Sequence, residues 1–115
     1  MIKIENNTGL YIKEEIVNFQ KGIDIILLKL SESYKEVKTL TLTSINNGIA
    51  INQCCNWDKN NINMDWFNDN FIITDGRNSI SVNKDANIII RDRKKLSHSF
   101  DIVFTDFQMV LTGIY

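Results

Sequence analysis

The clearest indication of the fold class in this 115-residue chain is the segment Val37-Lys38-Thr39-Leu40-Thr41-Leu42-Thr43-Ser44-Ile45. Leu40 and Leu42 alternate with threonines, and a period of two predicts a strand with one buried and one solvated face. The next three residues, Asn46-Asn47-Gly48, tolerate the positive φ of a tight turn. The apolar pattern then resumes at Ile49, so the sequence predicts a β-hairpin.

The same pattern recurs along the chain. Asp75-Gly76-Arg77-Asn78 separates two further short apolar segments and predicts a second hairpin. Asn83 to Asn87 forms a turn into Ile88, and two more strand-like segments follow. Roughly eight candidate strands at this spacing predict an all-β fold, a small antiparallel β-sandwich or barrel, with room for one short helix. No linker or repeat divides the chain, so we expect a single domain over residues 1–115.

Three segments are harder to assign. Leu10 to Phe19 fits both helical and strand spacing, and Ile16-Val17 favours a strand. Ile23 to Leu30 is apolar on both faces, which predicts a strand buried on both sides. Ser31 to Glu36 fits either one helical turn or a wide loop.

Composition narrows the class of protein. The chain is 43% hydrophobic and 23% charged, as in globular domains. A net charge of −1 argues against direct nucleic-acid binding, which normally leaves a basic surface. The only basic cluster, Arg91 to Lys95, is interrupted by Asp92 and reads as a solvated turn. The sequence shows no signal peptide and no apolar run that could span a membrane, and it has no pair of cysteines suited to a disulfide, so we expect a cytoplasmic protein.

The residues that carry most enzymatic chemistry are scarce. His98 is the only histidine, and the two cysteines, Cys54 and Cys55, are adjacent, so no metal site or redox framework is expected. Ser97, Ser99 and Asp101 flank His98, but a catalytic triad depends on convergence in space rather than on local sequence. No phosphate-binding loop is present. The sequence therefore predicts a protein without a cofactor that is not an enzyme.

One segment differs from the rest, from Asn56 to Gly76. It combines both tryptophans with four aspartates and a single lysine, and the region from Asn52 to Asn70 breaks the strand pattern and reads as a long loop. Rigid aromatic anchors within an acidic rim are typical of a surface that binds a basic protein. The partner-binding residues predicted on this basis are Asp58, Asp65, Trp66, Asp69 and Asp75. In the alternative interpretation, Trp57 and Trp66 fill the core and the polar residues only solvate a crossover.

A short, mildly acidic chain that is rich in Asn, Ile and Lys and has no catalytic motif resembles the immunity proteins of bacterial toxin–immunity systems, such as those of contact-dependent growth inhibition. The resemblance implies a non-enzymatic inhibitor that masks the active site of one cognate toxin domain, often a basic nuclease. Two alternatives stay open. One is a β-sandwich that binds a small ligand or carbohydrate, with Trp57 or Trp66 as a stacking platform. The other is a structural or assembly protein that acts by strand addition.

Overall fold

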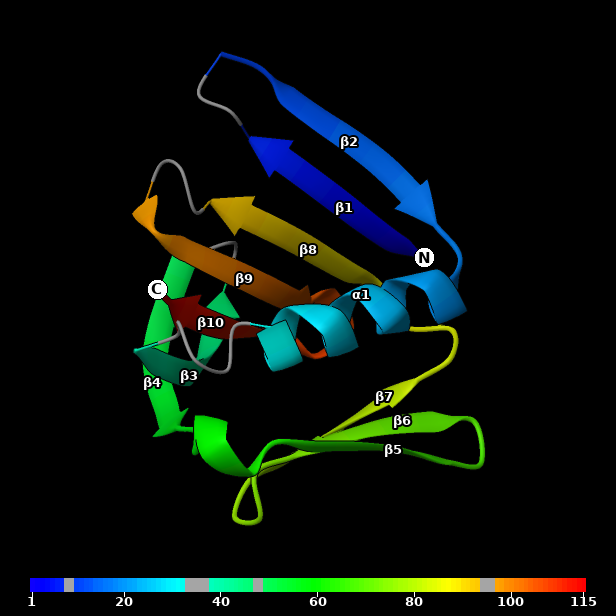
Figure 1. Ribbon diagram of the computed structural model, residues 1–115, viewed down its shortest axis with the longest axis vertical. Coiled ribbons are helices and arrows are strands. Elements are labelled where there is room, and N and C mark those ends of the chain that lie inside the picture. The colour runs from blue at the N-terminus through cyan, green and yellow to red at the C-terminus, as the bar shows by residue number, and fades with distance from the viewer. Residues whose placement is uncertain (8–9, 33–37, 47–48, 94–96) are drawn as a thin grey trace.

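The computed structural model describes residues 1–7, 10–32, 38–46, 49–93 and 97–115. Within these residues the chain is mostly strand with one α-helix, and its strands form two sheets that do not close into a barrel (Figure 1). The predicted all-β class with one short helix is therefore confirmed.

The larger sheet has seven strands in the order β2-β1-β8-β9-β10-β3-β4. Its strands are β1 (Ile2–Asn7), β2 (Ile12–Val17), β3 (Thr39–Asn46), β4 (Ile49–Asn56), β8 (Ile88–Arg93), β9 (Ser99–Phe104) and β10 (Met109–Ile114). Neighbours are antiparallel except β1 and β8, which are parallel, with Ile2 opposite Ile88. The expectation of a purely antiparallel domain is wrong at this pair, because strands so distant in the chain carry no local signal of their pairing.

The smaller sheet consists of β5 (Asn63–Phe67), β6 (Asn70–Thr74) and β7 (Ser79–Asn83), all antiparallel. A short 3₁₀ helix, η1 (Lys59–Asn61), precedes it, and a second one, η2 (Thr105–Phe107), joins β9 to β10. The strand expected over Phe71 to Thr74 is confirmed as β6, whereas the segment from Asn52 to Asn70, expected to be a long loop, contains the end of β4, η1 and β5. Its polar residues obscured the alternation because β5 is an edge strand with one face in solvent.

The segment from Ile23 to Leu30 is helical, which corrects the predicted strand. Helix α1 (Phe19–Glu32) begins after Asn18, whose side chain accepts a hydrogen bond of 2.8 Å from the backbone N–H of Lys21. Ile23, Ile26 and Leu30 recur at helical spacing and are buried on one face. The Asn18 cap is the signal that could have identified the helix, since periodicity alone cannot assign a short run that is apolar on both faces.

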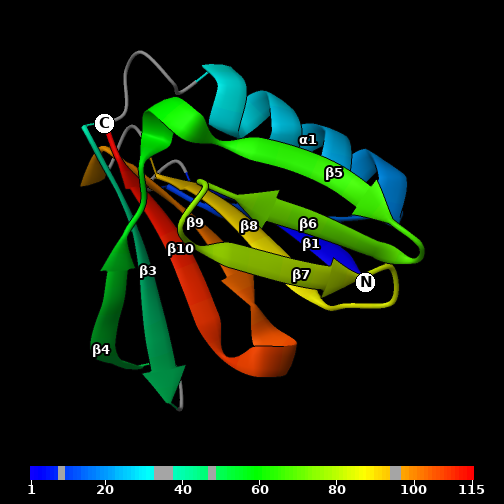
Figure 2. The same ribbon diagram turned by 90° about the horizontal axis from the view of Figure 1, so that it is seen from below.

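One hydrophobic core lies between the layers. Helix α1 and the smaller sheet lie side by side against the same face of the larger sheet (Figure 2). Every second residue of the central strands points into this core, for example Phe100, Ile102 and Phe104 of β9. The side chains between them point to the other face of the larger sheet, which no described element covers.

The remaining predictions concern two hairpins, the segment from Leu10 to Phe19, the basic cluster and the cysteines. The β3–β4 and β6–β7 hairpins are confirmed, and Leu10 to Phe19 contains the favoured strand, β2. Ser31 and Glu32 end α1, whereas residues 33–36 lie outside the described residues, as do residues 94–95 of the basic cluster. Residues 91–93 of that cluster belong to β8, which corrects the expected solvated turn. Cys54 and Cys55 lie in β4.

Candidate functional site

Asp75, one of the five predicted contact residues, is a buried structural carboxylate. Its side chain is 4% exposed and accepts hydrogen bonds from the backbone N–H groups of Asp58 (2.8 Å), Arg77 (2.9 Å) and Asn78 (2.6 Å), and from the Asn78 side chain (3.2 Å). Burial raises the pKa of this carboxyl, but the hydrogen bonds from Asn78, Asp58 and Arg77 outweigh it and lower the pKa to about 2. Its assignment as a partner-binding residue is corrected, because its oxygens are occupied within the chain.

Asp58 is exposed and caps η1. Its side chain accepts hydrogen bonds from the backbone N–H of Asn60 (3.0 Å) and from the side-chain amide of Asn61 (2.5 Å). Such a cap satisfies donors that the first turn of a helix leaves open. Asp58 is therefore at the surface, but its carboxylate is held by local structure.

Asp65 and Trp66 point to opposite faces of the smaller sheet, because they are neighbours on one strand. Trp66 lies opposite Phe71, and its ring contacts the rings of Phe71 and Phe19 at centroid distances of 5.3 and 5.6 Å. Asp65 shares the outer face with Phe67. The predicted acidic rim around Trp66 is thus divided between two faces, and Trp66 links α1 to the smaller sheet.

Phe67, which was not among the predicted contact residues, is an exposed aromatic residue of β5. Its side chain is 66% exposed, against 40% for Trp66. The signal that could have found it is its register, since it lies two positions after Asp65 on the outer face. Asp69 is exposed in the β5–β6 turn, with one carboxylate oxygen 3.7 Å from Nζ of Lys84. Asp58 and Asp69 lie at opposite ends of β5, so the acidic residues are spread along the hairpin and do not form one cluster.

Trp57 is buried, which removes it as a stacking platform for a ligand. It follows β4 directly, and its backbone N–H donates to the carbonyl of Leu40 at 2.8 Å. For Trp57, the alternative interpretation of the tryptophans as core residues is the one that agrees with the structure.

The face of the larger sheet that points away from α1 carries an open groove of about 540 Å³. Four apolar residues, three threonines and three charged residues line it: Ile45, Ile89, Val103, Val110, Thr43, Thr105, Thr112, Arg91, Arg93 and Asp101. They come from β3, β8, β9 and β10 and from the first residue of η2. We call the surface formed by these ten residues and the adjoining Lys3, Glu5 and Glu14 the open face.

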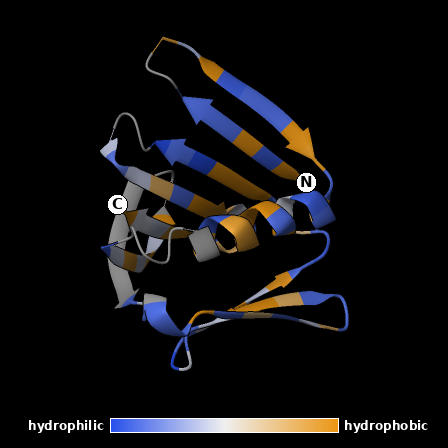
Figure 3. Cartoon of the chain, in the orientation of Figure 1, coloured by the Kyte–Doolittle hydropathy of each residue, from blue (hydrophilic) through white to orange (hydrophobic). Residues whose placement is uncertain are grey.

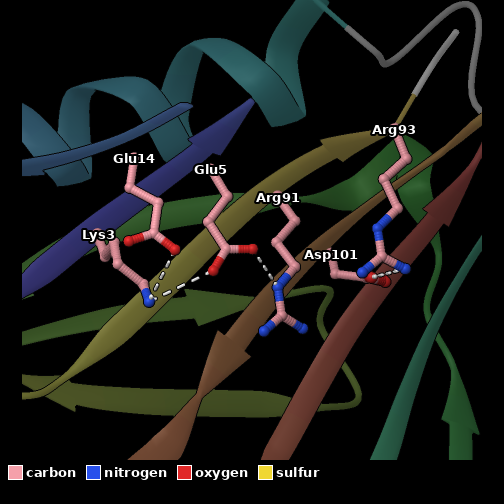
Figure 4. A network of polar contacts seen from close by, with 6 residues as sticks. All are labelled: Lys3, Glu5, Glu14, Arg91, Arg93 and Asp101. Atoms are coloured by element: carbon pink, nitrogen blue, oxygen red, sulfur yellow. Dashed lines mark hydrogen bonds and ion pairs between the residues drawn. The ribbon is translucent and has the colours of Figure 1, made fainter. Parts of the chain in front are cut away.

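Ion pairs cross the strands of the open face in a row (Figure 4). Nε of Arg91 lies 2.7 Å from Oε2 of Glu5, whose other oxygen is 3.4 Å from Nζ of Lys3. The same Lys3 lies 3.7 Å from Oε1 of Glu14. Burial raises the pKa of Glu5, but Arg91 and Lys3 outweigh it and hold that pKa below its usual value. Glu5 is therefore kept as an anion between two cations.

The groove end of this row is ordered in the same way. Nη1 of Arg93 lies 3.8 Å from Oδ2 of Asp101, and the hydroxyl of Thr112 donates to Oδ1 of Asp101 at 2.9 Å. The described contacts of Asp101 are thus with residues of the larger sheet.

His98 is exposed with a left-handed φ of 54°, and the hydroxyls of Ser97 and Ser99 lie 2.8 Å apart. His98 and the two serines are not among the residues that line the groove.

The described residues contain no candidate metal site and no candidate membrane-spanning helix. No three His, Cys, Asp or Glu side chains among them are placed to share a metal ion, and no helix among them has both the length and the apolar character to cross a membrane. Comparison with protein-family models, with curated proteins and with solved structures finds no match for this chain.

Proposed function

We propose that this chain is a non-enzymatic protein-binding inhibitor, an immunity protein that neutralises a cognate toxin domain, and that its open face makes the contact. The proposal rests mainly on the groove of about 540 Å³ on an uncovered sheet face, where the row Ile89, Val103 and Val110 lies beside a row of ordered charges. Protein interfaces usually combine apolar contact area with polar and charged groups at its margin.

The ordering of the charges supports a binding role. Glu5 and Arg91 are largely shielded from solvent and hold each other in one arrangement. A surface whose long side chains are already fixed loses less conformational entropy on association. Arg91 and Arg93 also belong to the residue type that is enriched in interfaces, because guanidinium groups bind carboxylates in a defined geometry.

The charge pattern indicates what kind of partner would fit. The open face carries three cations (Lys3, Arg91, Arg93) and three anions (Glu5, Glu14, Asp101), so recognition would depend on matching alternating charges. Asp65 and Asp69 remain exposed on the other side of the molecule. They would speed the approach of a basic toxin, such as a nuclease domain, without touching it in the complex.

Co-expression tests the function. The C-terminal domain of a toxin-like protein encoded beside the gene is induced in a bacterial host with and without this chain. If this chain relieves the growth arrest caused by the toxin domain, the result supports an immunity protein that acts in the cytoplasm. If no neighbouring toxin-like protein is neutralised or bound by the purified chain, the proposed function is wrong.

A matched pair of charge reversals tests the surface. Arg93→Glu changes the open face, whereas Arg77→Glu makes the same change in the exposed β6–β7 turn. We expect Arg93→Glu to raise the dissociation constant for the toxin domain by about tenfold or more, and Arg77→Glu to leave it nearly unchanged. Equal affinities for the two variants would place the interface elsewhere.

Of the two alternative functions, carbohydrate binding and assembly by strand addition, the structure favours the second. The residues that line the groove include no aromatic side chain on which a sugar could stack, so we do not propose carbohydrate binding. Assembly by strand addition is the second candidate, because no described strand pairs with the outer side of β2.

A further inference from the structure

Strand β2 forms one edge of the larger sheet and is the outermost strand in Figure 1. It pairs with β1 along one side over its full length, from Val17 opposite Ile2 to Ile12 opposite Asn7. No described strand pairs with its other side. This leaves an edge of six residues, about 20 Å long, with backbone donors and acceptors available to another strand.

This edge lacks two of the usual protections against pairing, a β-bulge and a proline, and its charged centre, Lys13-Glu14-Glu15, is the protection that it retains. The β1–β2 register has no shift, whereas at the opposite edge the β3–β4 register shifts between Leu42 and Thr43 and again between Ser44 and Ile45. Bulges of that kind twist an edge away from foreign strands. The chain contains no proline that could protect β2 in another way.

The side chains of β2 are largely exposed and include two isoleucines. Ile12 and Ile16 are 58% and 66% exposed, and both lie on the side of the sheet that carries the open face, where Ile16 is opposite Lys3. Figure 3 shows the apolar ends of β2 on either side of a hydrophilic centre. Apolar residues exposed on a regular edge strand are typical of a strand that pairs with another chain.

We propose that two copies of this chain pair through β2, antiparallel and about a twofold axis at Glu14, and so join their larger sheets into one. A twofold axis perpendicular to the sheet keeps each side chain on its own face, and residues directly opposite each other in an antiparallel pair point to the same face. The axis must therefore pass between the two copies of a single residue. With the axis at Glu14, Ile12 lies opposite Ile16 of the second copy. Lys13 then lies opposite Glu15 of the second copy, and each of these pairs occurs twice.

This register is better than its neighbours. An axis at Lys13 would place Ile12 opposite Glu14 and Lys13 opposite itself, and an axis at Glu15 would place Glu14 opposite Ile16. Apolar pairs and opposite charges directly across two strands stabilise a sheet, and like charges destabilise it. At the chosen axis the two Glu14 carboxylates meet, but in each copy Lys3 lies 3.7 Å from Glu14 and offsets their repulsion.

The dimer places both open faces on the same side of the joined sheet, because the axis is perpendicular to it. The inference does not depend on the proposed function. A chain that binds no toxin can still pair through β2, and a monomer can still be an inhibitor.

Sedimentation equilibrium and a charge swap test the pairing. The chain should sediment with twice its monomer mass at high concentration and dissociate on dilution. Lys13→Glu should raise the dimer dissociation constant about tenfold or more, because it places two carboxylates opposite each other at two positions. Adding Glu15→Lys to Lys13→Glu should restore most of the lost affinity. Lys84→Glu, the same change on an exposed residue of the turn that follows β7, is the matched control.

A crosslink tests the axis itself. Glu14→Cys places two thiols opposite each other, so oxidation should give a disulfide-linked dimer. Lys13→Cys should not crosslink, because its two copies are offset by two residues along the strands, beyond the reach of a disulfide. The parent chain, which retains Cys54 and Cys55, is oxidised in parallel. A monomer at all concentrations, or a dimer insensitive to Lys13→Glu with no crosslink at position 14, would overturn the proposal.

Discussion

The backbone N–H of Asp58 donates a hydrogen bond of 2.8 Å to the carboxylate of Asp75, which lies 17 residues further along the chain. The bond joins the segment that leaves β4 to the β6–β7 turn. The same carboxylate orders that turn through the backbone N–H groups of Arg77 and Asn78. Two aspartates that the sequence placed together on a binding surface are thus in contact, and the contact supports the fold.

Replacing Asp75 should therefore destabilise the domain. In Asp75→Asn, the charged acceptor becomes an amide that presents two donors to the N–H groups around it, and we expect a loss of about 2 kcal/mol in the free energy of unfolding. Asp85→Asn, at an exposed turn position, should change it by less than about 0.5 kcal/mol. Urea denaturation followed by tryptophan fluorescence measures both variants. Equal stabilities would mean that Asp75 does not hold the turn.

The contribution of Asp75 should depend on pH. Its pKa falls from the ordinary 3.8 to about 2 in the folded protein, so the unfolded chain takes up this proton first as the pH falls. The stabilisation, on the order of 2 kcal/mol, is complete above about pH 5 and is lost progressively towards pH 2. The difference in unfolding free energy between the parent and Asp75→Asn should shrink over that range. A difference that stays constant from pH 7 to pH 2 would contradict this assignment.

The Glu5–Arg91 ion pair should contribute more than an exposed pair. A double-mutant cycle with Glu5→Gln and Arg91→Gln should give a coupling energy of about 1 kcal/mol, because both side chains are partly buried and 2.7 Å apart. The matched cycle uses Glu15→Gln and Lys21→Gln, whose charged groups are 3.4 Å apart and more than half exposed, and should give less than about 0.5 kcal/mol. Similar coupling energies in the two cycles would show that partial burial does not strengthen the Glu5–Arg91 ion pair.

Gly22 should resist substitution although it lies within a helix. An alanine Cβ there would lie 2.8 Å from Cγ2 of Ile2, which is fully buried, and closer still to its Cδ1. We expect Gly22→Ala to cost about 2 kcal/mol, which exceeds the roughly 1 kcal/mol by which alanine favours a helix. Ile2→Val removes the Cδ1 atom, so Gly22→Ala should cost less in that background. A stabilising Gly22→Ala in thermal denaturation would refute the close packing of α1 on β1.

Replacing Trp66 should destabilise the domain more than replacing its neighbour Phe67. Trp66→Ala removes ring contacts to Phe19 and Phe71 that link α1 to the smaller sheet, and should cost about 2 kcal/mol. Phe67→Ala, on the outer face of the same strand, should change stability by less than about 0.5 kcal/mol. Chemical denaturation followed by circular dichroism avoids the change in tryptophan content. If Trp66→Ala were neutral, its packing role would be wrong.

Local patterns predicted much of the fold. The alternation around Leu40 and Leu42 predicted β3 and its buried face, because strand geometry alone sends successive side chains to opposite sides. Asp75-Gly76-Arg77-Asn78 predicted the β6–β7 turn, because Gly76 adopts a φ of 89° that other residues rarely accept. These features depend on residues close together in the chain.

The candidate site could not be obtained in this way. The open face combines Glu5 with Arg91 and Arg93 with Asp101, and these pairs form only when β1, β8 and β9 become neighbours. Composition instead indicated the segment from Asn56 to Gly76, because aspartates and tryptophans are conspicuous there. It could not show that Asp65 and Trp66 point to different sides of a strand, since the strand itself was hidden among polar residues.

Local sequence was enough to predict the β class, the turns and the strands that alternate cleanly, because steric preferences and period-two burial act over a few residues. Tertiary contacts were needed to establish the helix over Ile23 to Leu30, the parallel pairing of β1 with β8 and the burial of the Asp75 carboxylate. Each of these depends on partners far away in the chain. The close approach of Gly22 to Ile2, and the hydrogen bond from the Asp58 N–H to the buried Asp75, stabilise one conformation among several that the local sequence allows.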